Sequence, residues 1–269
     1  MTALSRRALR HGLAATSAIL CAAALAGAAT TAAAAGGKTY LGDSIEIGHG
    51  TAQAVVETDA AGRPQSIGIS LSPGAIEGLP EGRNKDSAEG SWEFDLPLPK
   101  TPVATGYGAI QIDWNPLGHP PPGIYTVPHF DFHFYLMTPD QVERVAFTGP
   151  ADPAAAAPDP ALVPPGYKVI PETAVNRMGV HGVDVTGPEF HGKPFTATFV
   201  YGYYEGRLTF VEPMVTTAYL HSKPALSLPV KTPERYSTAG YYPTRYSVRY
   251  DAAKKRYLVE LDDLKSWKP

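Results

Sequence analysis

The sequence predicts a mainly β protein, an antiparallel barrel or sandwich with one or two short helices. The chain contains 27 prolines and 26 glycines. Prolines interrupt both helices and sheet interiors, so a chain this rich in them is expected to have many connections and little helix. Several segments alternate polar and apolar residues with the two-residue period of a strand. Clusters of Gly, Pro, Asp and Asn separate these segments, as expected for turns between short strands.

Apart from one segment treated below, the predicted strands are residues 44–56, 65–71, 92–96, 107–114, 195–203, 207–211, 245–250 and 256–261. The last four are expected to form two hairpins, because only short turn sequences separate their members. One short helix is predicted from residue 138 to about 147, with Thr138 as N-cap, Pro139 in the first turn and Gln141 closing a capping box. Residues 149–166, rich in Pro and Ala, predict a linker or a long surface loop.

The N-terminus has the features of an export signal. A basic segment containing Arg6 and Arg7 precedes an apolar stretch at 13–26, and small residues at 32–35 offer cleavage sites. The segment from Ser5 to Leu9 resembles a twin-arginine motif, although Arg10 stands where that motif usually has an apolar residue. The apolar stretch is short and Ala-rich, so we expect a cleaved signal and no membrane span.

We therefore predict a signal peptide at residues 1–35 and a single β-rich domain at residues 36–269, exported to the periplasm or the extracellular space by the twin-arginine or the general secretory route. Cleavage would remove three of the 23 basic residues and none of the 26 acidic ones, leaving a net charge of 20 − 26 = −6. An acidic protein without a basic cluster is a poor nucleic-acid binder. Cleavage also removes Cys21, the only cysteine, so metal ligands in the mature chain must be nitrogen and oxygen atoms.

The most informative segment is residues 128–135, a predicted strand with two unlike faces. One face carries His129, Asp131 and His133, and the other carries three phenylalanines that require a core. Neighbours on one face of a strand lie roughly 7 Å apart, so adjacent pairs can share a metal ion, but the two histidines, roughly 13 Å apart, could share one only with a bulge or a strong bend. Further ligands must therefore come from elsewhere. The alternative is a polar face that lines a wet cavity, in which Asp131 only fixes a histidine tautomer.

Two later residues complete the candidate set. His181 lies between glycines in what we expect to be a loop, and Glu212 follows the apolar end of a predicted strand. His119, in a proline-rich loop, is expected to cover the same cavity, whereas His191 and His221 lie in polar turns and are expected to be solvated. The predicted ligands of a divalent transition metal (Zn, Fe or Mn) are thus His129, Asp131, His133, His181 and Glu212.

Two arrangements fit known metal chemistry. A cupin-like barrel would supply histidines and a glutamate from facing strands, but its usual His-x-His has Asp131 at the second histidine position here. Alternatively, His129, Asp131 and His181 would form the two-histidine, one-carboxylate facial triad of iron(II) enzymes. An oxygenase that uses an oxoacid also needs a basic anchor, for which only Lys193 and Arg207 are available.

Residues 113–116, 118–120, 128–135, 178–181 and 212–214 together resemble a family of uncharacterised, mostly exported bacterial proteins. That family is typified by a Thermus protein under the control of an extracytoplasmic-function sigma factor. The resemblance covers most of the mature chain and is most specific at 128–135. It implies a β-rich domain outside the cytoplasm and a homo-oligomer, but no established reaction.

The leading hypothesis is an exported β-rich domain that binds a divalent transition metal, with a metal-dependent small-molecule enzyme as one form of it. Whether the protein is an enzyme is left open. The alternative is a non-catalytic, oligomeric envelope-stress or ligand-binding protein. A third hypothesis is metal-free acid–base catalysis by Asp131 and Glu212. The sequence has no Gly-x-Ser-x-Gly elbow and no phosphate-binding glycine motif.

Overall fold

The computed structural model describes residues 36–87, 89–149 and 151–268. The predicted signal peptide, residues 1–35, lies outside these ranges. None of the helices within them is long and apolar enough to cross a bilayer.

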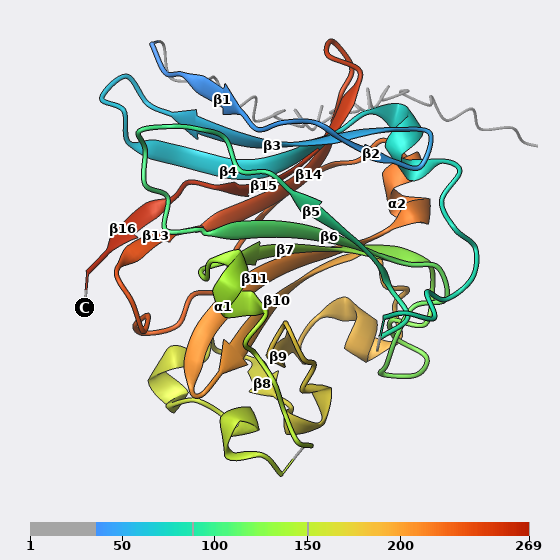
Figure 1. The fold of residues 1–269 in the computed structure, drawn as a ribbon, viewed down its shortest axis with the longest axis vertical. Coiled ribbons are helices and arrows are strands. Elements are labelled where there is room, and N and C mark those ends of the chain that lie inside the picture. The colour runs from blue at the N-terminus through green and yellow to red at the C-terminus, as the bar shows by residue number, and fades with distance from the viewer. Residues whose placement is uncertain (1–35, 88, 150, 269) are drawn as a thin grey trace, which may run out of the picture. The chain divides into compact units, whose positions relative to one another are not determined.

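The described chain forms two large antiparallel sheets and a small two-stranded one (Figure 1). The first sheet has the order β1-β3-β4-β15-β14-β12, with β2 paired to β3. Its strands are β1 (Thr39–Leu41), β2 (Ile45–Ile47), β3 (Gly50–Thr58), β4 (Pro64–Leu71), β12 (Ala225–Pro229), β14 (Arg245–Asp251) and β15 (Arg256–Asp262).

The second sheet has the order β5-β6-β7-β11-β10-β9-β8. Its strands are β5 (Trp92–Leu96), β6 (Ala109–Asn115), β7 (His129–Tyr135), β8 (Tyr167–Val169), β9 (Val180–Asp184), β10 (Ala197–Tyr204) and β11 (Arg207–Thr216). β13 (Gly240–Tyr242) and β16 (Lys265–Trp267) form the small sheet.

The helices are short. The two α-helices are α1 (Pro139–Val142) and α2 (Thr217–His221), and the 3₁₀ turns are η1 (Pro73–Ile76), η2 (Pro153–Ala155), η3 (Pro160–Leu162), η4 (Pro171–Thr173) and η5 (Pro188–His191).

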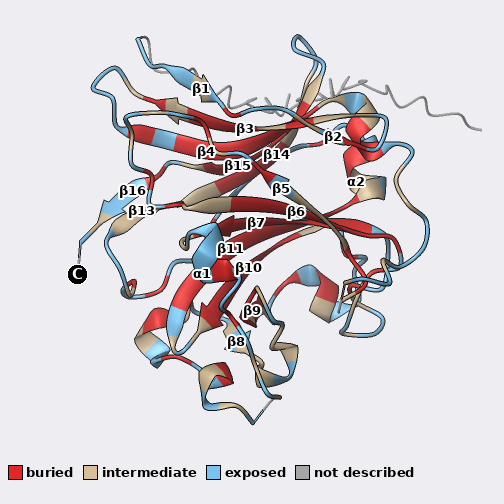
Figure 2. Ribbon diagram, in the orientation of Figure 1, coloured by how far each residue is buried: buried red, intermediate tan, exposed pale blue. Residues whose placement is uncertain are grey.

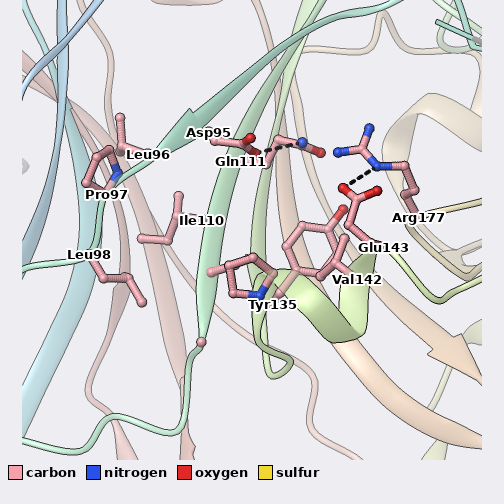
Figure 3. Close-up of a pocket in the computed structure, with 13 residues that line it drawn as sticks. Asp95, Leu96, Pro97, Leu98, Ile110, Gln111, Tyr135, Val142, Glu143 and Arg177 are labelled. Carbon is pink, nitrogen blue, oxygen red and sulfur yellow. Dashed lines mark hydrogen bonds and ion pairs between the residues drawn. The ribbon is translucent and has the colours of Figure 1, made fainter.

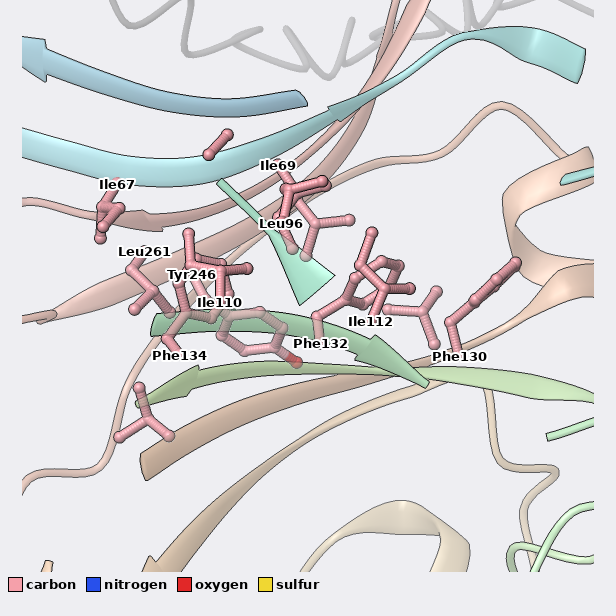
Figure 4. Close-up of a cluster of buried hydrophobic side chains, with 14 of the residues drawn as sticks. Ile67, Ile69, Leu96, Ile110, Ile112, Phe130, Phe132, Phe134, Tyr246 and Leu261 are labelled. Carbon is pink, nitrogen blue, oxygen red and sulfur yellow. The ribbon is translucent and has the colours of Figure 1, made fainter. Parts of the chain in front are cut away.

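The main core lies between the inner faces of the two large sheets (Figure 4). From the first sheet come residues such as Ile67, Ile69 and Leu261, and from the second come Phe132 and Phe134. All five side chains are fully buried. The phenylalanine face of β7 therefore faces the core, as the alternation predicted, and its polar face points to the other side of the second sheet.

This arrangement confirms the sandwich and shows that the closed barrel is wrong, whereas the cupin-like resemblance stays a prediction. In the described residues neither large sheet closes on itself, because β5 and β8 are opposite end strands of the second sheet and do not pair.

Two local predictions were also wrong. Residues 44–56 are not one strand, because Gly48 adopts φ = 55° and turns the chain back between β2 and β3. The helix from Thr138 has its capping box, with the Thr138 N–H donating to Gln141 Oε1 at 2.9 Å, but it ends at Val142 rather than near Phe147. The Phe147 N–H donates instead to Asn176 Oδ1, so the backbone has already left helical hydrogen bonding.

Residues 149–166 form a packed surface loop and not a free linker. Of their described residues, Ala155 and Leu162 are buried, and the Tyr203 hydroxyl donates to the Leu162 carbonyl at 3.0 Å. The loop is therefore held against β10.

Candidate metal centres

The outer face of the second sheet, opposite the main core, carries an unusual set of buried polar groups. Every residue of β7 is buried, including those on this face, as its uniform colour in Figure 2 shows. The neighbouring strands add further buried polar residues to it. Those on β6, β7 and β11 are Gln111, Asp113, Asn115, His129, Asp131, His133, Glu212 and Thr216.

Aromatic and aliphatic side chains seal one end of this face. Tyr125, Val183, Phe195, Val200 and Met214 form a small apolar cluster distinct from the main core. The Phe195 ring contacts His129 edge to face, with ring centroids 5.5 Å apart. Burial under these side chains removes the polar groups from water, so their charges must be balanced within the protein.

The first centre consists of His119, His129 and Asp131. The Nε2 atom of His129 lies 3.1 Å from Asp131 Oδ1, and Nε2 of His119 lies 3.3 Å from Asp131 Oδ2. Asp131 Oδ2 also accepts a hydrogen bond of 2.7 Å from Asn115 Nδ2. The sequence led us to expect that His119 only covers the cavity. In the structure its Nε2 atom is part of the cluster.

The hydrogen bonds at the far side of each imidazole fix its tautomer. His129 Nδ1 lies 2.7 Å from the Val127 carbonyl oxygen, and His119 Nδ1 lies 2.8 Å from that of Pro120. A carbonyl oxygen has no proton to give, so each Nδ1 must carry the hydrogen. In the neutral imidazole, Nε2 then presents a lone pair towards the carboxylate. This is the orientation in which main-chain carbonyls commonly hold metal-bound histidines.

The spacing of these atoms is that of ligands around one ion. Bonds of about 2.0–2.2 Å to a first-row metal place neighbouring ligand atoms about 2.8–3.6 Å apart, from octahedral to tetrahedral geometry. The contacts of 3.1 and 3.3 Å lie in this range. The 3.1 Å contact lacks hydrogen-bond geometry, and His129 Nε2 and Asp131 Oδ1 have no other partner in the described chain.

The charges in the first centre favour an ionised carboxylate. Burial alone would raise the pKa of Asp131, but the adjacent His129 and His119 outweigh burial and lower it below its usual range. Burial opposes protonation of His119, but attraction to Asp131 raises the pKa of that imidazole. A proton can thus hold this cluster together only by charging an imidazole, whereas a metal ion would satisfy both nitrogens and the carboxylate at once.

The second centre consists of His133, His181 and Glu212. Glu212 Oε2 lies 3.7 Å from His133 Nε2 and 3.9 Å from His181 Nε2. His181 Nδ1 lies 2.9 Å from the Thr173 carbonyl oxygen, so this imidazole has the same tautomer as those of the first centre. Burial lowers the pKa of His133 to about 3 and that of His181 to about 4, so both rings are neutral at pH 7. Burial raises the pKa of Glu212, with a further contribution from Asp131.

The structure therefore contains two clusters that could each hold a metal ion, where the sequence predicted one set of ligands. The two clusters separate His129 and Asp131 from the other three predicted ligands. The facial triad of His129, Asp131 and His181 is accordingly wrong, because His181 groups with His133 and Glu212. Metal binding by each of these residues stays a prediction.

The positions of the two later ligands also differ from expectation. His181 lies in β9, opposite Gly202 of β10, and not in a loop. Glu212 lies within β11, which continues to Thr216 instead of ending at Val211. Lys193 and Arg207 are exposed, so neither provides a basic anchor beside the buried centres.

The absence of a side chain at Gly202 of β10 lets the Phe210 ring of β11 reach His181 of β9 at the second centre. A Cβ at Gly202 would lie 2.0 Å from Phe210 Cε1, so only glycine leaves room for that ring. The Phe210 ring contacts the imidazoles of His133 and His181 edge to face, at centroid distances of 4.9 and 5.4 Å.

Sequence reasoning missed Asp113, the carboxylate of β6 nearest the second centre. Its side chain is buried, Oδ2 lies 3.7 Å from His133 Nδ1, and neither oxygen has a hydrogen-bond partner among the described residues. Burial raises the pKa of Asp113 well above its usual range, and the nearby Asp131 adds to this effect. The signal was available, because Gln111, Asp113 and Asn115 alternate with apolar residues just as the residues of β7 do.

A cavity of about 260 Å³ lies at the edge of the second sheet, between β5, β6 and α1 (Figure 3). Leu96, Leu98 and Ile110 line its apolar side, and Gln111 and Tyr135 lie at the end nearest the second centre. The Tyr135 ring stacks on His133, with centroids 5.5 Å apart and an interplanar angle of 13°. The small-molecule ligand expected from the sequence stays a prediction.

No family model matches the chain, and neither a curated protein nor a solved structure matches it. The resemblance to the exported bacterial family described above therefore stays a prediction.

Proposed function

We propose that the protein binds a divalent transition metal ion at the first centre, through Nε2 of His119, Nε2 of His129 and the carboxylate of Asp131. The observation that supports this most strongly is the pair of imidazoles whose Nδ1 atoms are held by main-chain carbonyls while their Nε2 atoms face one carboxylate at 3.1 and 3.3 Å. The Asn115 amide adds an outer contact that orients Asp131.

The ligand types restrict the ion. Two imidazoles and one carboxylate suit zinc, iron(II) or manganese, whereas calcium and magnesium prefer sites made only of oxygen. Three protein ligands leave at least one coordination position for water or a substrate atom, as in catalytic rather than structural centres. An ion with an open position would supply Lewis-acid activation of water or, as iron(II), oxygen chemistry.

The route to the ion is on the side of His119. The side chain of His119 is 23% exposed, whereas that of His129 is fully buried. A ligand would therefore approach across the loop that carries His119. We also keep the proposal of export, which rests on the N-terminal sequence. The twin-arginine route, which carries folded proteins, would allow the ion to be inserted before export.

The test is metal analysis of the mature protein, purified without an affinity tag and passed through a metal-free column. We expect stoichiometric metal in the wild type and its loss from the first centre in His119→Ala, whose side chain lies in a partly exposed loop and should be tolerated. His191→Ala, which changes an exposed histidine outside both centres, is the matched control. Equal metal content in wild type, His119→Ala and His191→Ala would refute the proposal.

A further inference from the structure

We propose that His133, His181 and Glu212 form a second site for a divalent transition metal, and that Asp113 is its outer positioning residue. This inference deepens the proposed function, because it assigns the protein two ions instead of one. It rests on side chains other than those of the first centre.

Several buried polar atoms at the second centre have no hydrogen-bond partner in the described chain. In the described chain both ring nitrogens of His133, Oε2 of Glu212 and both oxygens of Asp113 make no hydrogen bond. Buried polar groups nearly always find partners, so unmatched donors and acceptors gathered at one place indicate a site for something else. All three side chains are almost completely inaccessible to solvent. A cation suits the site, because two of the three groups are carboxyls.

Both imidazoles of the second centre have an oxygen atom on the Nδ1 side of the ring. His181 is held through Nδ1 by the Thr173 carbonyl, like the histidines of the first centre. His133 is in mid-strand, and its Nδ1 faces Asp113 Oδ2 instead of a main-chain oxygen. A carboxylate that accepts the Nδ1 hydrogen would leave Nε2 free to bind an ion beside Glu212. A carboxylate behind a metal-bound histidine is a common arrangement that fixes the ring and raises its basicity.

The pairing of β6 with β7 places one residue of β6 beside each centre. Asn115 pairs with His129 and Asp113 pairs with Asp131, so β6 presents two side chains, two residues apart, to the same face. Asn115 contacts Asp131 of the first centre, and Asp113 approaches His133 of the second. One strand thus supplies an outer residue to each centre.

The second centre is more open than the first. Its nitrogen–carboxylate distances of 3.7 and 3.9 Å exceed the spacing of about 2.8–3.6 Å expected around one ion. An ion would therefore draw the ligands together by a few tenths of an ångström. The side chain of His181 is 17% exposed and lies in β9, near the edge of the sheet, so it is the ligand with most freedom to move.

The experiment is titration of the metal-free mature protein with Co²⁺ and Zn²⁺ alone, followed by visible absorption and calorimetry. We expect two ions in the wild type, one in His119→Ala and one in His181→Ala, with a different cobalt spectrum in each variant. No ion in the wild type would refute the proposed function and this inference together. One ion in the wild type, lost in His119→Ala and kept in His181→Ala, would refute this inference alone.

Asp113 is tested in the His119→Ala background, where only the second site remains. Asp113→Ala should weaken binding there about 10–100-fold, whereas Asp113→Asn, which keeps an acceptor oxygen, should retain most of the affinity. The ¹⁵N shifts of His133 should report Nδ1–H in the parent and a mixture of tautomers in Asp113→Ala. Asn115→Ala is the matched control: it should weaken the first site, measured in the His181→Ala background, and leave the second site unchanged in the His119→Ala background. Unchanged affinity and unchanged tautomer in Asp113→Ala, or equal losses in Ala and Asn, would refute the positioning role.

Discussion

Asp131 provides the most informative single substitution, because Asp131→Asn changes the charge of the first centre with almost no change in size. Its carboxylate contacts both imidazoles of that centre and the Asn115 amide. We expect the variant to fold, because the amide still offers an oxygen to Asn115. Losing an outer contact of a metal site costs about 10–100-fold in affinity, so losing a direct anionic ligand should cost at least about 100-fold.

The corresponding change in stability can be estimated. Metal at about 100 times its dissociation constant stabilises the folded state by about 2.7 kcal/mol, which falls to about 0.4 kcal/mol when binding weakens 100-fold. For a domain of about 150–250 residues, about 2–4 °C of melting temperature corresponds to each kcal/mol. The metal-induced rise in melting temperature should therefore be about 5–11 °C with Asp131 and about 1–2 °C in Asp131→Asn.

The assay is thermal unfolding followed by circular dichroism, with and without Zn²⁺, in the His181→Ala background so that only the first centre responds. Asp95→Asn is the matched control, since Asp95 is an exposed carboxylate on β5 of the same sheet. A metal-induced rise in Asp131→Asn equal to that in the control would refute the reasoning, whatever the stability of the metal-free variant.

Three further predictions concern other parts of the molecule. Burial raises the pKa of Glu260 to about 7 despite its 2.7 Å contact with Arg249. The folded state therefore binds the Glu260 proton more tightly than the unfolded state does, and the free energy of unfolding falls as pH rises from about 4.5 to 7. Urea titrations at several pH values should show that Glu260→Gln removes this fall and gains about 1–3 kcal/mol at pH 8, and an unchanged pH profile would contradict this. Phe132→Ala, at a fully buried core position, should cost about 3–5 kcal/mol in the same assay, and a loss below about 1 kcal/mol would show that the two sheets do not pack as described. Gly202→Ala should displace the Phe210 ring and lower the free energy of unfolding by about 1–3 kcal/mol. In a cobalt titration it should weaken binding at the second site but not at the first, and weaker binding at the first site alone would contradict this.

The two faces of β7 were predictable from the sequence because strict alternation leaves one solution for a strand with a phenylalanine face. Alternation does not tell which strands lie beside it. The register that places Asp113 opposite Asp131 and Asn115 opposite His129 comes from tertiary pairing, and the sequence carries no local signal for it. The division of the ligands into two centres follows from that pairing.

The two misplaced ligands have local causes. His181 lies between Gly179 and Gly182, which weaken strand propensity, so the local sequence predicts a loop where the structure has β9. Pro213 lacks an N–H, so the local sequence does not favour a strand that continues through it. In the structure β11 continues, and its pairing with β7 simply has no bridge at Glu212 and Pro213. The packing of β11 against its neighbours outweighs the loss of those hydrogen bonds.

The most direct test of the central claim is an anomalous difference map from crystals of the mature protein, recorded at the absorption edge of the metal found by elemental analysis. The account predicts a peak about 2.0–2.2 Å from Nε2 of His119, Nε2 of His129 and an Asp131 oxygen. The claim would be contradicted if the three side chains had clear density but no anomalous peak lay between them. In that case a hydrogen bond from an imidazolium to Asp131 would hold the cluster together.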